Sequence, residues 1–254
     1  MNASSLPPRF KAAADVLRPV VAVSSALVGL TAVVIAIGWR ALLAYYSELG
    51  GSWIIRIEPV ASLIYEGTKY VLPAAAFLLL GFLYFAHGWA TSVGLRRASI
   101  GVLFVGGALC VGPALFPEPP SPSTALSLTY LGAAFVSASA GLTVAEIIAR
   151  YHEQGSKWHP YFVWLLYLSV LYGFLWSPSL VGGARARADL DLTFTSLPMV
   201  ETTEQAGTGL LRLVAVSGDQ AILLALASEA TSRRFKVIAL KDLKAIHSSR
   251  NLRQ

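Results

Sequence analysis

The sequence predicts an all-α membrane helical bundle of about five transmembrane helices, followed by a small C-terminal β-rich soluble module. Of its 254 residues, 55% are hydrophobic and only 13% are charged, about half the charged share of roughly 25% in soluble domains. Long uncharged apolar runs fill the first two thirds of the chain. After Gly182, charges become frequent and apolar runs shorten to strand length. This change in pattern predicts two parts with different solvents.

The N-terminal region predicts a basic head and a retained first span. Residues 1–18 carry Arg9, Lys11 and Arg18, and an apolar run follows at 19–41. The apolar region of a secretory signal peptide covers roughly 7–15 residues. The run at 19–41 is longer than that, so it is interpreted as a transmembrane helix that is not removed.

The next segment, residues 42–69, is predicted to be amphipathic and to lie at the membrane interface. Arg56, Glu58 and Glu66 are spread through it, and each charge would cost about 2.5–3.5 kcal/mol at a bilayer centre. Glu58, Ser62 and Glu66 recur every fourth residue, which places them on one helix face. A helix with one polar face and one apolar face is typical of interfacial segments.

Four further apolar runs are each long enough to cross the hydrocarbon core, about 30 Å thick, as helices. Their central parts lack charged residues, and charges or prolines occupy the loops between them. With the first span they define a transmembrane domain at 19–181. The four runs are 70–90, 99–116, 125–149 and 160–181.

The C-terminal region is divided into a linker, 182–204, and a small soluble module, 205–254. The module contains three short apolar segments separated by turn and charge signals. The middle segment is ambiguous: its Ala and Leu content suits a helix, but the preceding Ser-Gly-Asp turn signal favours a hairpin strand. The three segments are 209–216, 221–227 and 235–240.

Small residues recur every fourth position in two of the predicted spans. Such a stripe forms a groove that lets a second helix approach closely, which is how helices associate in lipid. The alternative is chance in an Ala- and Gly-rich sequence. The residues predicted to pack are Ala133, Ser137, Gly141 and Ala145 in the fourth span, and Ser25 and Gly29 in the first.

Ionisable residues near the span ends are the polar-site candidates. Glu146 and Arg150 are four residues apart and can pair on one helix face, whereas His87 lies beside Trp89 as interfacial residues often do. His152 and His159 share a loop, but their spacing matches no common metal-binding pattern. The single cysteine has no disulfide partner in the chain. We therefore expect no catalytic residue, no metal and no cofactor.

The net charge of +6 is assigned to lipid contact and orientation, not to nucleic acid, because the basic residues flank apolar runs. Counts of Lys and Arg in short loops favour a cytoplasmic N-terminus in the plasma (inner) membrane. Five spans would then put the C-terminal module outside. Arg185 and Arg187, just after the fifth span, argue against that orientation.

These features favour a non-enzymatic multi-pass membrane protein. Besides the lipid bilayer, its expected partners are further copies of itself, through the helices, and a protein bound or sensed through residues 205–250. The alternatives are a channel or transporter and, less favoured, a membrane enzyme acting on lipid. The channel or transporter would need mid-membrane charges, which the spans lack, and the enzyme would need a nucleophile or metal cluster, which the sequence lacks.

Overall fold

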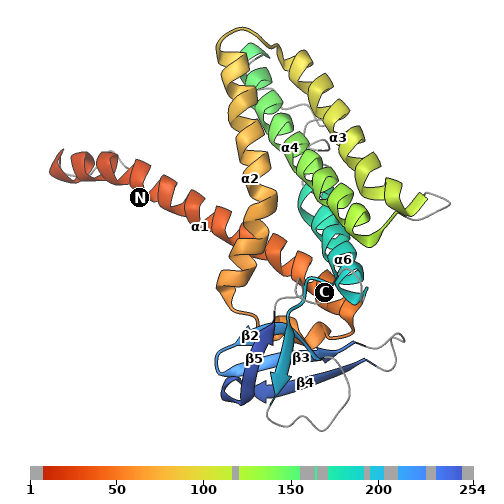
Figure 1. Ribbon diagram of the computed structural model, residues 1–254. Coiled ribbons are helices and arrows are strands. Elements are labelled where there is room, and N and C mark those ends of the chain that lie inside the picture. The colour runs from red at the N-terminus through yellow and green to blue at the C-terminus, as the bar shows by residue number, and fades with distance from the viewer. Residues whose placement is uncertain are drawn as a thin grey trace.

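The computed structural model describes residues 8–115, 120–154, 164, 171–191, 195–202, 211–226 and 233–247. Within these residues the chain is mostly helical, with four long apolar helices and one shorter helix, and it ends in a small antiparallel sheet. This confirms the coarse fold class predicted from the sequence. Figure 1 shows the helices gathered above the sheet, with one long helix projecting to the side.

The four long helices each contain a stretch that is long and apolar enough to cross a membrane. About 20 residues suffice, because a helix rises 1.5 Å per residue. The helices are α1 (Pro8–Leu49), α2 (Val60–Ala86), α3 (Ser92–Leu115) and α4 (Pro122–Gln154). Their candidate spans are Leu27–Leu49, Val60–Ala86, Ser92–Leu115 and Pro122–Glu153.

Of the predicted fifth span, 160–181, the structure describes residue 164 and residues 171–181, and the rest lies outside the described residues. Its last part forms the π-helical turn η3 (Leu171–Trp176) and the start of α6 (Ser177–Leu190). In Figure 1, α2 and α4 run away from the sheet, and α6 runs back toward it. The end of α4 and the end of α6 therefore lie at opposite ends of the bundle.

Residues 42–69 do not form the separate amphipathic helix that the sequence predicts. The short 3-10 turn η2 (Ser52–Arg56) separates α1 from α2, and α2 then continues unbroken from Val60 to Ala86. The charge of Glu66 is accommodated inside this long helix because Lys69 and Arg185 both contact its carboxylate. The sequence pattern could not show the second of these partners.

Residues 182–204 also contain more structure than the predicted linker. Helix α6 extends to Leu190, and strand β1 begins at Met199. Between them, the Asp189 carboxylate accepts hydrogen bonds from the backbone N–H and the hydroxyl of Ser196, at 2.9 and 2.6 Å. These bonds hold the chain as it leaves the helix and enters the sheet.

The helices pack as two linked groups. Helix α4 contacts α2, α3 and α6, whereas α1 contacts α2 and α6. The crossing of α1 and α2 is very close: a Cβ added at Gly38 would overlap the Leu63 carbonyl, and one added at Gly67 would overlap the Val34 carbonyl. The first half of α1 projects away from the bundle (Figure 1).

The sheet has the strand order β4-β3-β2-β1-β5, with every neighbouring pair antiparallel. In the segment 221–227, whose composition suits a helix and whose turn signal suits a strand, residues 221–225 belong to strand β3. The prediction from the sequence missed the two strands β1 and β5. The strands are β1 (Met199–Thr202), β2 (Leu211–Ser217), β3 (Gln220–Ala225), β4 (Arg234–Ala239) and β5 (Leu243–His247).

One face of the sheet shares an apolar core with the helices. Ile222 and Leu224 of β3 are fully buried against Leu49 of α1 and Ile54 of η2. The alternate residues of β3 point to the other face, as expected for a strand, and Leu223 packs there with residues of the sheet itself. The sheet is therefore packed onto the end of the bundle.

Candidate functional site

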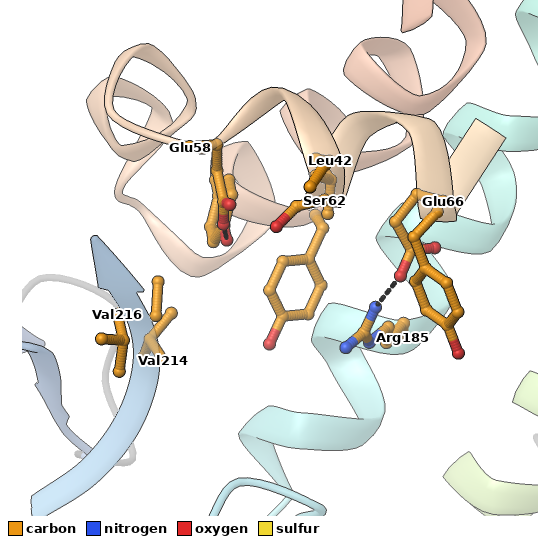
Figure 2. A pocket seen from close by; sticks show the side chains of 12 residues that line it. Leu42, Glu58, Ser62, Glu66, Arg185, Val214 and Val216 are labelled. Atoms are coloured by element: carbon orange, nitrogen blue, oxygen red, sulfur yellow. Dashed lines mark hydrogen bonds and ion pairs between the residues drawn. The ribbon is translucent and has the colours of Figure 1, made fainter. Parts of the chain in front are cut away.

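A pocket of about 450 Å³ lies where three helices meet the sheet. Figure 2 shows it between the first turns of α2, the end of α6 and strand β2. Its volume falls in the range of about 300–1,000 Å³ usual for small-molecule sites. The lining residues are Leu42, Tyr45, Tyr46, Glu58, Ala61, Ser62, Tyr65, Glu66, Arg185, Val214, Ala215 and Val216.

The polar face of α2 forms one wall of this pocket. Ser62 and Glu66 lie on it, and Glu58 lies two residues before the helix begins; Glu58 is nearest the β2 side chains and Glu66 is nearest Arg185 (Figure 2). The four-residue spacing brings Ser62 and Glu66 to one face of α2. That face meets other parts of the same chain, so the polar stripe lines a pocket and does not simply face bulk water.

Glu66 receives two cations on a single oxygen. Its Oε1 accepts a hydrogen bond from Lys69 Nζ at 2.7 Å and one from Arg185 Nη1 at 3.1 Å. The Arg185 guanidinium also lies 4.9 Å from the ring centroid of Tyr45, and Lys69 Nζ lies 4.5 Å from that of Tyr65, both within cation–π range. The carboxylate of Glu66 thus faces two cations, and the carboxylate of Asp189 is a further negative neighbour of the Arg185 guanidinium.

Arg185 keeps its charge in this setting. Burial lowers the pKa of its guanidinium, but the neighbouring Tyr45 and Glu66 outweigh burial, and the pKa is raised overall. About a third of the side chain, 34%, remains exposed. A ligand that enters the pocket can therefore contact the charged guanidinium of Arg185.

Two tyrosines at the end of α1 join the pocket walls. Tyr45 Oη donates a hydrogen bond to Asp189 Oδ2 at 2.9 Å, and Tyr46 Oη donates one to Glu58 Oε1. The first bond joins α1 to α6, and the second joins α1 to the start of α2. Because Asp189 also accepts from Ser196, the position of the sheet is linked to the position of the helices.

A second group of charges lies at the far end of α4. Glu146 is 1% exposed; its Oε1 lies 3.6 Å from Arg150 Nη2 and 3.8 Å from Arg96 Nε. Nearby, Glu153 Oε2 accepts a hydrogen bond of 2.6 Å from the Ser92 hydroxyl at the start of α3. These contacts join α3 to α4. They include Glu146 and Arg150, which the sequence analysis expects to pair on one helix face.

The histidine candidates do not come together in a site. His87 is exposed just beyond α2, with Nδ1 2.9 Å from the Leu83 carbonyl oxygen. His152 packs its ring edge-on against Phe85, and His159 lies outside the described residues. In the part of the chain that the structure describes, no group of three His, Cys, Asp or Glu side chains is arranged to hold a metal ion.

The small residues of the fourth predicted span are buried inside this chain. Ala133, Ser137, Gly141 and Ala145 all lie on the inner surface of α4. A Cβ added at Gly141 would overlap the carbonyl of Ala74 in α2. The two small residues of α1 are placed differently: Ser25 and Gly29 are exposed, and nothing lies within 4 Å of a Cβ added at Gly29.

Reasoning from sequence missed Arg185 and Asp189 as parts of a site. Arg185 is separated from Glu66 by 119 positions and Asp189 from Tyr45 by 144, so no local spacing could connect them. The only signals in the sequence were indirect. Glu58, Ser62 and Glu66 recur every fourth residue, and Arg185 follows the end of an apolar run. Comparisons with protein-family models, with curated proteins and with solved structures found no match.

Proposed function

We propose that this chain is a non-enzymatic multi-pass protein of the plasma (inner) membrane that forms homo-oligomers through its helices and binds or senses a partner through its C-terminal sheet. The observation that carries the proposal is the junction of the sheet and the helices. Ile222 and Leu224 share one core with Leu49, and the pocket lies beside that core. A partner that binds the sheet would therefore act directly on the helix ends.

The outer surface of the helices supports location in a membrane. Large apolar side chains stand exposed along all four long helices, including Val28, Leu79, Phe104 and Leu131. Soluble proteins seldom expose large contiguous apolar surfaces. Lipid tails would cover these side chains without cost, as they do on transmembrane bundles.

The exposed face of α1 supports self-association. Ser25 and Gly29 are both exposed, and the first half of α1 projects from the bundle (Figure 1). Small residues one turn apart allow two helix backbones to approach closely. A second copy of α1 would fit such a face, whereas the small residues of α4 are already used within the chain.

Two measurements test the proposal. The protein should stay in the membrane pellet after alkaline carbonate extraction, and in nanodiscs it should be larger than one copy. Gly29→Leu should reduce the oligomer without unfolding the protein, whereas Gly101→Leu on α3, where nothing lies within 4 Å of an added Cβ, is the matched control. Release by carbonate would refute membrane location, and a monomer in nanodiscs would refute self-association.

A channel or transporter is the second candidate, and buried charges favour it. Glu66 and Glu146 are 8% and 1% exposed, and both lie in helices long and apolar enough to cross a membrane. Ionisable groups inside membrane helices often mark transport pathways. Ion or proton flux into liposomes that depends on Glu146 would favour transport over the partner-binding function.

A further inference from the structure

The pocket beside the sheet has a carboxylate at one end and two cationic side chains, paired with a second carboxylate, at the other. Glu58, two residues before α2 begins, is one end; its Oε1 accepts a hydrogen bond from the Tyr46 hydroxyl, and a carboxylate has further lone pairs to offer. At the other end, Arg185 and Lys69 share one oxygen of Glu66. The two carboxylates are eight residues apart in the chain, with Glu58 on the β2 side of the pocket and Glu66 beside Arg185 (Figure 2). A ligand with a positive and a negative group would match this arrangement.

An apolar hollow of about 510 Å³ continues from the pocket along the outside of α2. The two hollows share Ala61 and Tyr65, so they are adjacent. Ile64 and Leu72 line the second hollow and are 38% and 65% exposed. Lys69 lines it as well, which places a cation where the polar pocket meets the apolar surface. A molecule lying across both hollows would be polar at one end and apolar at the other.

We propose that this combined site binds an aminophospholipid of the phosphatidylethanolamine type. Its ammonium would contact Glu58, its phosphate would contact Arg185 and Lys69, and an acyl chain would lie over Ile64 and Leu72. The inference rests on the proposed membrane location and goes beyond the proposed partner binding, because it names a lipid ligand for the junction of helices and sheet.

The chemistry of the site selects this headgroup among common lipids. Arginine recognises phosphate through several N–H donors, and 34% of the Arg185 side chain is exposed. A primary ammonium can donate hydrogen bonds to Glu58, whereas a trimethylated choline has no N–H to donate. An uncharged glycerol headgroup would leave Glu58 facing no cation. Phosphatidylethanolamine should therefore bind better than phosphatidylcholine or phosphatidylglycerol.

The test is native mass spectrometry of the intact protein in detergent, titrated separately with these three lipids. Wild-type protein should retain phosphatidylethanolamine preferentially. Arg185→Gln and Glu58→Gln should each bind it about tenfold less, the loss expected from removing one charge-assisted hydrogen bond. Arg187→Gln is the matched control, since Arg187 is exposed on the same helix and does not line the pocket.

A second variant distinguishes loss of lipid binding from loss of folding, because Arg185 also contributes to the packing of α6 against α2. Ser62→Leu keeps every charge and fills the pocket, so it should reduce lipid retention while leaving the elution volume and circular dichroism unchanged. Equal retention of all three lipids would overturn the inference, and so would unchanged retention in Ser62→Leu. Binding of soluble phosphoethanolamine without retention of the lipid would overturn it as well. Carbonate extraction reports separately on the proposed membrane location.

Discussion

Tyr45 and Asp189 form a buried hydrogen bond, 2.9 Å long, between residues 144 positions apart in the chain. The two side chains are 3% and 2% exposed. The same carboxylate accepts two hydrogen bonds from Ser196. This single acid therefore connects the end of α1, the end of α6 and the segment that leads into the sheet.

Tyr45→Phe should lower stability measurably. It removes one donor from a buried carboxylate, a loss of about 1–3 kcal/mol. Tyr70→Phe is the matched control: Tyr70 is also 3% exposed, and its hydroxyl has no hydrogen-bond partner among the described residues. Thermal unfolding of both variants in one detergent should show a lower midpoint for Tyr45→Phe only. Equal midpoints would mean that the Tyr45–Asp189 bond contributes no net stability.

Gly141→Ala should destabilise the bundle, because the added methyl group meets the Ala74 carbonyl. Overpacking of this kind costs about 1–3 kcal/mol, and Gly141→Leu should cost more. Gly107→Ala in α3 is the control, since nothing lies within 4 Å of its added Cβ; there alanine should stabilise the helix by up to about 1 kcal/mol. Opposite signs in a thermal unfolding assay are expected. Unchanged stability in Gly141→Leu would refute the close contact of α2 and α4.

Arg96→Gln should destabilise the far end of α4, whereas Arg97→Gln should not. Arg96 lies 3.8 Å from the buried Glu146, and Arg97 is exposed. Breaking a fully buried pair costs about 3–5 kcal/mol. Arg96 is 28% exposed and Arg150 remains beside Glu146, so about 1–2 kcal/mol is expected here. Combining Arg96→Gln with Glu146→Gln should give less than the sum of the two losses, and full additivity would show that the groups do not interact.

Cysteines at Ser52 and Lys241 should react with an impermeant thiol reagent from the same side of the membrane. Ser52 is in η2 and Lys241 follows β4, and both are exposed. The sheet packs on this segment: Phe235 lies edge-on to Trp53, and the Ser217 hydroxyl donates to the Ile57 carbonyl at 2.6 Å. The labelling uses a Cys110→Ala background.

A cysteine at Arg97 is the comparison, and it should react from the opposite side because it lies at the other end of α2 and α4. Labelling of Ser52→Cys and Lys241→Cys from different sides would contradict the packing of the sheet on η2. Reporter fusions after Gln254 then decide which side this is. Only the alkaline-phosphatase fusion should be active if the sheet is outside, as a cytoplasmic N-terminus and five spans predict.

Apolar runs predicted the long helices well because they reflect local composition. Composition could not predict how the helices cross. Gly38 and Gly67 carry the contact of α1 with α2, but neither belongs to a repeating stripe. Their role depends on two helices meeting at one point, and a sequence contains no direct information about that point.

Glu66 shows that the partners of a charged residue are also hard to predict from the sequence when they come from a distant segment. A glutamate in an apolar segment predicts an interface when its partners are unknown. Lys69 was visible three residues later, but Arg185 comes from α6. Strands β1 and β5 were missed for a related reason: β1 is four residues long and gains its stability from pairing with a segment far along the chain.

The strand order also has a consequence for biosynthesis. Strand β1 occupies a position between β2 and β5, yet β5 is translated after every other strand. Until Leu243–His247 leaves the ribosome, one edge of β1 has no hydrogen-bonding neighbour, and an open edge invites pairing with other chains. A nonsense mutation before Leu243 would therefore release a nascent protein whose helices are complete but whose sheet is prone to aggregation and to clearance by quality-control proteases.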